Sequence, residues 1–221
     1  NTKLYTGNGG TQSITGVGFA PNWIWIKNRT SAEGSGVFDT VRGVTKMLCS
    51  QNSDGESTTA NSLTAFGSDG FSVGANNRVN QNSNNIVSWN WKAETSFTND
   101  ASATGIGSID SAGSVNQDAG FSICTFTGTG SAGTIKHGLN TVPKMIIVKG
   151  RSEAKAWTVY HSALGAGKAI FLEQTATPTT SDAYFGGTTP TSSVFSVGSS
   201  TNVTGNGITF VAYAFAPKQG F

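Results

Sequence analysis

Two parts of this chain carry the same motifs in the same order, which restricts the fold to a pair of similar modules. The recurring segments are residues 5–7 (YTG) and 126–128 (FTG), 21–29 (PNWIWIKNR) and 143–151 (PKMIIVKGR), 71–74 (FSVG) and 195–198 (FSVG), and 86–91 (IVSWNW) and 210–215 (FVAYAF). Similar residues at the same place in both copies serve the shared fold. A residue that only one copy has is free to serve a function.

The composition favours short strands joined by tight turns. Charged residues make up 12% of the 221 residues, against about 25% in an ordinary soluble protein. Gly (29 residues), Ser, Thr and Asn replace them, and these residues suit turns and strands. The net charge of +2 is scattered along the chain, which excludes a nucleic-acid surface. The apolar runs are too short for membrane insertion.

We therefore expect an all-β fold of two tandem antiparallel β-sandwich modules of the jelly-roll type. The first module is predicted to cover residues 1–93 and the second residues 120–221. Residues 94–119 are rich in Ser, Ala, Gly and Asp and are interpreted as a linker, in which residues 103–115 could add an edge strand.

Alternating patterns in the first copy predict short strands at residues 3–7, 12–15, 23–27, 37–41, 46–49, 63–66, 71–73 and 84–92. The Asn-Gly pair in residues 7–10 (GNGG) is typical of a hairpin turn, so the first two strands are expected to pair. Residues 67–70 (GSDG) predict a second hairpin, and no segment shows a helical period.

The sequence predicts no catalytic residues, no metal site and no cofactor. His137 and His161 lie far apart, and the first copy has Thr15 and Asp39 in their places. No local signature supports a Ser–His–Asp arrangement, and the acidic residues fall mostly in predicted loops. Two His and two Cys without close spacing do not make a zinc site. Calcium binding by loop oxygens stays open, although no Asp-x-Asp-x-Asp run occurs.

Four tryptophans are replaced by other large apolar residues in the second copy, as core positions allow. Trp23 pairs with Met145, Trp25 with Ile147, Trp89 with Tyr213 and Trp91 with Phe215. We expect all four in the core or between sheets.

A different aromatic group is the predicted surface contact, for a ligand or another subunit. Trp157 has Ser35 as its counterpart, so the shared fold does not require it, and Tyr160 and His161 lie nearby in sequence.

Basic residues recur in both copies and form a second candidate contact. Lys27 corresponds to Lys149 and Arg29 to Arg151, and Lys46 corresponds to Lys168. Solvated strand ends explain them, and a contact with a neighbouring subunit or an anionic glycan is the alternative.

Cys49 and Cys124 stand at non-equivalent positions. Two unpaired thiols are expected, with one inter-module disulfide as the alternative. The chain begins at Asn1 without an initiator Met, so we expect a piece of a longer polypeptide or a processed product.

The chain resembles a family of uncharacterised repeat-bearing bacteriophage proteins, especially from marine phages, of the tail-fibre or virion-surface type. The motifs that carry the resemblance are residues 5–9 (YTGNG), 16–21 (GVGFAP), 25–29 (WIKNR), 38–43 (FDTVRG), 63–66 (LTAF), 69–71 (DGF), 89–93 (WNWKA) and 159–162 (VYHS). They cover nearly the whole chain outside residues 94–119. The resemblance carries over no catalytic residue, and it implies that the polypeptide continues beyond residues 219–221 (QGF).

The resemblance and the residues together lead to the expectation of a non-enzymatic structural protein on the virion surface, outside the host cell. We expect part of a tail fibre or adhesin that contacts the host. Its expected partners are other virion proteins, further copies of itself and a host cell-surface glycan. Two alternatives remain: a capsid decoration (cement) protein, and a carbohydrate-binding module of a secreted protein.

Overall fold

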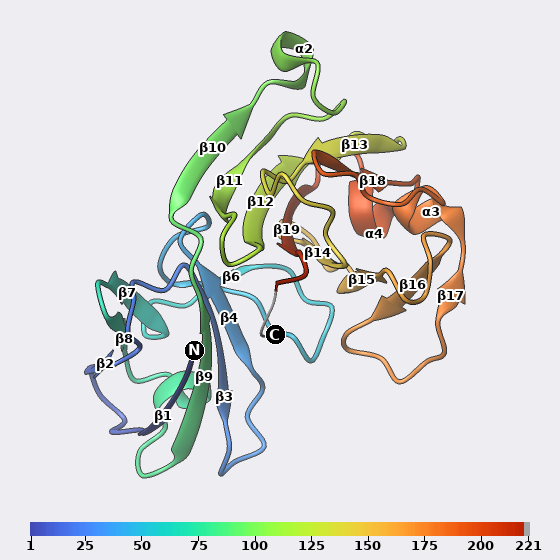
Figure 1. Ribbon diagram of the computed structural model, residues 1–221. Helices are drawn as coiled ribbons and strands as arrows, with labels where there is room; N and C mark the ends of the chain where they lie inside the picture. The colour runs from blue at the N-terminus through green and yellow to red at the C-terminus, as the bar shows by residue number, and fades with distance from the viewer. Residues whose placement is uncertain (219–221) are drawn as a thin grey trace. The chain divides into compact units, whose positions relative to one another are not determined.

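The computed structural model describes residues 1–218, and its regular secondary structure is mostly antiparallel strand (Figure 1). Strands make up 41% of the chain and helices 7%, which confirms the predicted all-β class. The chain divides into two compact units. Unit 1 contains Asn1–Asn52 and Glu56–Lys92, and unit 2 contains Ser53–Gly55 and the chain from Ala93 onward.

The described part of unit 1 contains short strands and one helical turn. They are β1 (Thr2–Thr6), β2 (Gln12–Thr15), β3 (Trp23–Asn28), β4 (Gly36–Asp39), β5 (Lys46–Met47), β6 (Ser57–Thr58), β7 (Leu63–Gly67), β8 (Gly70–Val73), α1 (Asn77–Asn80) and β9 (Asn85–Trp91).

Unit 2 repeats most of this order, without a described strand in the place of β7, and adds further elements. They are β10 (Thr95–Asn99), α2 (Ala101–Thr104), β11 (Ser111–Asn116), β12 (Phe121–Thr127), β13 (Gly133–Lys136), β14 (Met145–Gly150), β15 (Thr158–His161), β16 (Lys168–Phe171), β17 (Thr179–Thr180), α3 (Asp182–Phe185), β18 (Val194–Val197), α4 (Thr201–Thr204) and β19 (Thr209–Phe215).

Most strand pairings of unit 1 recur in unit 2, but no described strand of unit 2 takes the place of β7. Unit 1 has a sheet of order β1-β9-β3-β4 and a second of order β2-β8-β7, with β5 paired to β6. In unit 2, β12, β19, β14 and β15 follow one another in the same order, β13 pairs with β18, and β16 pairs with β17. The two copies of the sequence repeat therefore share the central strand order of the main sheet and the strand pair β2–β8 or β13–β18.

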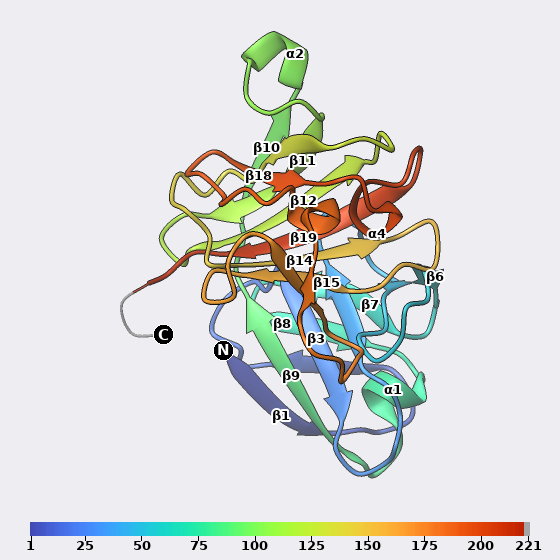
Figure 2. The same cartoon turned by 90° about the vertical axis from the view of Figure 1, so that its right-hand side faces the viewer.

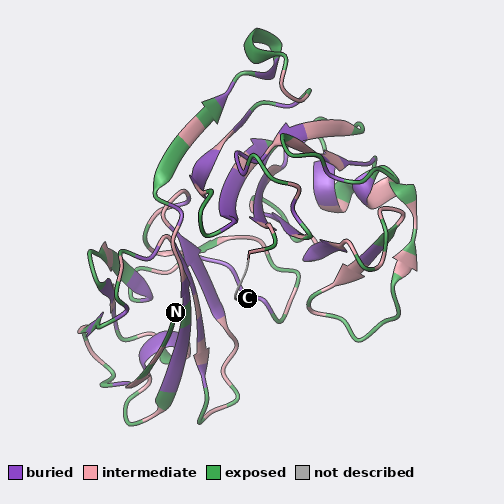
Figure 3. Ribbon diagram, viewed as in Figure 1, coloured by how far each residue is buried: buried purple, intermediate pink, exposed green. Residues whose placement is uncertain are grey.

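Each unit has its own core, built from equivalent residues of both of its main sheets. In unit 1, Ile24, Ile26 and Ile86 pack in one cluster with Phe71 and Val73. Their counterparts in unit 2 are Ile146, Val148, Phe210, Phe195 and Val197, which again share one cluster. Figure 3 shows these strands as the buried parts of the ribbon. Side chains two positions apart in a strand lie on the same face of its sheet, which places these residues on the core side.

The prediction of a linker at residues 94–119 is wrong, because this segment is part of the sheet of unit 2. β10 pairs with β11, and β11 pairs with β12, so the sheet gains two strands at this edge. Helical turn α2 lies at the tip of the hairpin, as Figures 1 and 2 show. The alternative of an added strand within residues 103–115 is closer, because β11 covers Ser111–Asn116, although β10 and not β11 forms the edge.

The predicted hairpin at residues 7–10 is also wrong, whereas the one at residues 67–70 is confirmed. β1 pairs with β9 and β2 with β8, so the turn between β1 and β2 connects two sheets. Gly7 N–H donates to Asn84 O (2.9 Å) and Gly9 N–H to Asn80 O (2.9 Å), which holds the turn against the end of α1. β7 and β8 form the second hairpin, with Phe66 opposite Phe71.

Candidate functional site

The segment that only unit 2 has forms one wall of an open groove of about 910 Å³. The ends of β10 and β11 supply that wall, and the end of β12 with the turn before β19 supplies the other. The lining residues are Thr98, Asn99, Asp100, Ser108, Ile109, Asp110, Ser111, Ala112, Thr125, Phe126, Thr127, Gly128, Thr129, Arg151, Asn206, Gly207 and Thr209. This groove is the best candidate site, because β10, α2 and β11 have no counterpart in unit 1 and the fold that both units share does not need them.

Two carboxylates shape the first wall by binding backbone N–H groups of α2. Asp100 caps the helical turn, accepting from Ala103 N (3.0 Å) and from the Ser102 hydroxyl (2.7 Å). Asp110 accepts from Ala101 N (2.8 Å). The Ser102 hydroxyl first, and then the Ala103 N–H, lower the pKa of Asp100. Asp100 therefore carries its negative charge at neutral pH.

The second wall is a turn that the repeat also builds in unit 1. Gly128 N–H donates to Ile208 O (2.8 Å), and Gly207 N–H donates to Gly128 O (2.9 Å). This pairing presents the exposed side chain of Asn206 to the groove. In unit 1 the equivalent asparagine is Asn82, since Asn82 approaches Gly9 as Asn206 approaches Gly130.

The groove offers hydrogen-bond donors and acceptors of many kinds. Threonine hydroxyls, asparagine amides and aspartate oxygens line it, with the half-buried Arg151 on one side. These groups suit a ligand rich in hydroxyls, because each can bind one as donor or acceptor. Within residues 1–218, no three His, Cys, Asp or Glu side chains gather closely enough to bind a metal ion.

The predicted basic residues fall into two kinds. Lys27 Nζ donates to the carbonyl of Glu33, and Lys149 Nζ donates to the carbonyl of Lys155 (2.8 Å), six residues later in both cases. Each lysine thus fastens the loop that follows its own strand.

Lys149 makes further contacts that fix it inside unit 2. It also donates to Gly150 O (3.0 Å) and Ser53 O (3.1 Å), and its ammonium lies 5.8 Å from the centre of the Trp157 ring. Lys149 is fully buried, so its predicted role as a surface contact is wrong. Arg29 is exposed, and Arg151 lines the groove.

The predicted aromatic surface contact is wrong for two of its three members. Trp157 is 1% exposed and Tyr160 is 2% exposed. Tyr160 packs in the core of unit 2, with its ring 5.7 Å from that of Phe185. His161 is half-buried, and its Nδ1 accepts from Ala163 N (3.2 Å).

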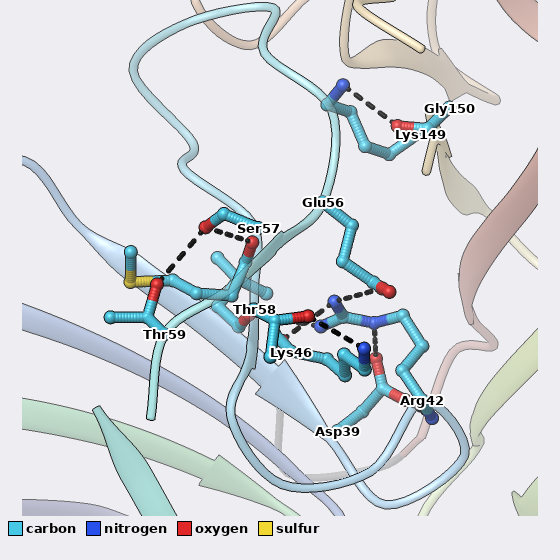
Figure 4. Close-up of polar contacts among 11 residues, drawn as sticks. Asp39, Arg42, Lys46, Glu56, Ser57, Thr58, Thr59, Lys149 and Gly150 are labelled. Carbon is cyan, nitrogen blue, oxygen red and sulfur yellow. Dashed lines mark hydrogen bonds and ion pairs between the residues drawn. The ribbon is translucent and has the colours of Figure 1, made fainter. Parts of the chain in front are cut away.

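In unit 1 the position of His161 belongs to Asp39, which performs the same local task in a buried ion cluster (Figure 4). Asp39 accepts from Arg42 N (2.8 Å), and Arg42 Nε binds its other oxygen at 2.5 Å. Arg42 also reaches Glu56 (3.0 Å) and the carbonyls of Lys46 and Val37 (3.0 Å each). These contacts satisfy the charges and hold the turn after β4, so the cluster is structural.

The four tryptophans of the first copy lie on one face of the main sheet of unit 1. The core cluster of unit 1 lies on the opposite face. Trp23 lies opposite Trp91 and Trp25 opposite Trp89 in the β3–β9 register. The alternating residues Ile24 and Ile26 fill the core, so the tryptophans project from the other side.

The expectation of core or inter-sheet positions is wrong for one pair of these tryptophans. Trp89 is 38% exposed and Trp25 is half-buried, with ring centres 6.3 Å apart. Trp23 is buried, and its ring centre lies 4.5 Å from that of Trp91.

Both cysteines are buried and neither forms a disulfide, which agrees with the expectation of two thiols without a bridge. Burial raises the pKa of the Cys124 thiol to about 12.

The sequence pattern did not reveal the groove. Its polar residues come from segments that are distant in sequence, and only the pairing of β11 with β12 brings them together. One local signal was present: Asp100 followed by Ala-Ser-Ala is typical of a helix N-cap.

Comparisons with known proteins place the chain in a family. No helix in residues 1–218 is both long and apolar enough to cross a membrane. No curated protein and no solved structure matches the chain. The family described as "Domain of unknown function (DUF7483)" matches residues 1–221. The chain therefore belongs to the DUF7483 family.

Proposed function

We propose that this protein is a non-enzymatic structural protein of the bacteriophage virion surface, part of a tail fibre or adhesin that contacts a host glycan. In this proposal each unit is a jelly-roll-like β-sandwich, and the groove of unit 2 is the contact site. The virion setting rests on the resemblance of the repeated motifs. The contact role rests on the groove.

The observation that carries the proposal is that residues present in both units hold loops and turns, whereas a segment present only in unit 2 forms the groove. The shared lysines fasten loops, and Asp39 and His161 cap equivalent turns. The unshared β10–β11 hairpin creates a hollow lined by hydroxyl, amide, carboxylate and guanidinium groups. Such a surface supports binding of a polar ligand by many weak hydrogen bonds.

The direct test is binding of the full chain to host cells and to an array of bacterial surface glycans. We expect Asn206→Ala and Thr98→Ala to weaken binding several-fold, because both exposed side chains line the groove. The matched control is Asn82→Ala, which removes the equivalent exposed asparagine from unit 1. Equal loss in the control, or no loss in the groove variants, would contradict a contact site in unit 2.

Imaging of intact particles separates the adhesin from a capsid decoration protein. Labelled chain on the fibres supports the proposal, and labelled chain on the head favours the decoration role. Turnover of a polysaccharide that is abolished by Asp110→Asn would overturn the non-enzymatic assignment.

One observation favours the second candidate, a carbohydrate-binding module. Trp89 and Trp25 present aromatic rings on an outer sheet face, and such rings offer large apolar surfaces with a polar edge. Loss of glycan binding in Trp89→Ala, with full binding in Asn206→Ala, would move the contact to unit 1.

A further inference from the structure

The main sheet of unit 1 ends at strand β1, and this edge differs from its counterpart in unit 2. β1 pairs with β9 on one side. In the described residues 1–218 no strand pairs with its other side. A bare edge carries unpaired N–H and C=O groups and is a template for a further strand.

In unit 2 the equivalent edge is paired with a further strand. β12 occupies the place of β1, and β11 runs antiparallel along it with Thr125 opposite Ala112 and Ile123 opposite Ser114. By the repeat, Thr125 corresponds to Leu4 and Ile123 to Thr2. The geometry of this edge is therefore compatible with an added antiparallel strand.

The hydrogen bonds around β1 define which of its groups face outward. Asn1 and Asn90 exchange two backbone bonds (2.8 Å each), and Gly7 N–H donates to Asn84 O. Because the pairing alternates along an antiparallel ladder, Thr2, Leu4 and Thr6 direct their N–H and C=O groups outward. Thr2 N–H binds the Asn1 side chain, and Thr6 O accepts from the Gln12 amide.

Leu4 stands at the centre of this edge and is the most exposed large apolar residue of the described chain, at 59%. Its side chain lies on the same face as Trp89, because Leu4 and Thr2 are opposite Val87 and Trp89 in the register. Thr2 and Thr6 are also exposed. The edge thus combines an apolar side chain in water with the outward N–H and C=O of Leu4, while the outward Thr2 N–H and Thr6 C=O would exchange their present side-chain partners for a further strand.

We propose that β1 pairs antiparallel with β1 of a second copy of this chain, about a two-fold axis at Leu4. The strand reads Thr2-Lys3-Leu4-Tyr5-Thr6, and this order is self-complementary. Leu4 meets Leu4 of the other copy, and Thr2 meets Thr6.

In the same register Lys3 meets Tyr5, so no like charges oppose one another. Isologous contacts of this kind are the commonest route to homodimers. The pairing extends the four-stranded sheet of each copy into one sheet across the axis.

Such an interface is small, so the dimer is expected to form at high protein concentration. Interfaces below about 1,200 Å² are typical of weak or transient association. The inference does not depend on the proposed function, since it concerns an edge in unit 1.

Disulfide trapping tests the axis directly. Residues directly opposite in a hydrogen-bonded pair have Cα atoms about 5.5 Å apart, which lies within the range for a disulfide. We expect Leu4→Cys to form covalent dimers under mild oxidation, while the buried Cys49 and Cys124 do not react. The matched control is Thr98→Cys on β10, the edge strand at the same side of the unit 2 sheet. Covalent dimer no more abundant than in Thr98→Cys would overturn the proposal.

Sedimentation provides a second measurement that does not depend on oxidation. Leu4→Pro removes the central outward N–H, and an edge strand tolerates proline at such a position. We expect the Leu4→Pro chain to self-associate at least tenfold more weakly than the unsubstituted chain. The Thr98→Pro chain is expected to self-associate as strongly as the unsubstituted chain. A chain that stays monomeric at millimolar concentration, or an equal effect of both prolines, would contradict pairing through β1.

Discussion

Lys27 and Lys149 show how one repeated residue comes to have different energetic weight in the two units. Both ammonium groups bind the carbonyl six residues later. Lys27 is half-buried, whereas Lys149 is fully buried and has two further carbonyl acceptors. A buried ammonium is tolerated only when its donors are satisfied, and the three carbonyls and the Trp157 ring provide that.

The first prediction compares Lys149→Met with Lys27→Met. Removing Lys149 leaves buried carbonyls without their donor, which costs about 1–3 kcal/mol for an unsatisfied group. We expect Lys149→Met to lower the free energy of unfolding by about 1–3 kcal/mol or more. Lys27→Met is expected to lower it by less than about 1 kcal/mol. Urea denaturation of both variants checks this. Equal losses would show that burial does not distinguish the two lysines.

The second prediction concerns the buried imidazole of His137. Its Nδ1 accepts from Leu139 N (3.2 Å), and its Nε2 donates to Thr191 O (3.1 Å), so the ring is neutral. Burial lowers its pKa below the ordinary value of 6.5. The unfolded chain therefore binds this proton more readily. The contribution to stability is complete above pH 6.5 and is lost as the pH falls from there toward the folded-state pKa.

The measurement is the free energy of unfolding at pH 7.0 and pH 5.5. We expect His137→Gln to remove a slope of at most about 1.4 kcal/mol per pH unit. His161→Gln controls for the loss of an imidazole as such. An unchanged slope in His137→Gln would contradict the assignment.

At the scale of elements, the sequence predicted the strands well where apolar residues alternate. β2 was predicted with the bounds that the structure has, and β3 and β9 to within one residue at either end. The helical turns α1 to α4 were missed, because four residues are too few to show a period. β11 was expected only as an optional edge strand within residues 103–115, because its residues are small. Its interior Gly113 is small for a steric reason, since a Cβ there would lie 2.0 Å from Ile123 O. The sequence pattern also did not show which strands pair, because the turn at residues 7–10 was predicted as a hairpin but connects two different sheets.

The third prediction follows from Gly113. We expect Gly113→Ala to separate β11 from β12 locally and to destabilise unit 2 by about 1–3 kcal/mol, the usual cost of overpacking. Gly167→Ala is the control, because a Cβ at that position meets its nearest atom at 3.4 Å. Hydrogen exchange of the β10–β11 hairpin reports the effect. Full protection in Gly113→Ala would contradict the close approach.

At the scale of the whole molecule, the low charge and the open groove predict weak single contacts. The net charge is +2 and charged residues are 12% of the chain, so long-range attraction contributes little. Function at a surface then depends on the number of copies that bind together.

The fourth prediction is therefore that adhesion depends more on the density of coupled chains than on the salt concentration. We expect chains coupled densely to beads to hold host cells with an apparent affinity about 10²–10⁴-fold above that of the free chain. Changing the NaCl concentration from 50 to 300 mM is expected to have little effect. Adhesion that vanishes at the higher salt concentration would instead indicate ionic capture. Dense and sparse coating with the Asn206→Ala variant supplies the control.

The β10–β11 hairpin extends one margin of the unit 2 sheet and adds Ile109 and Val115 to the core, while the core residues that unit 2 shares with unit 1 keep their places. Evolution can therefore change the exposed tip of this hairpin, for example by lengthening a single loop, without repacking the core residues that the two units share. If the groove is the contact site proposed above, its specificity can change at this tip while the rest of each unit stays the same.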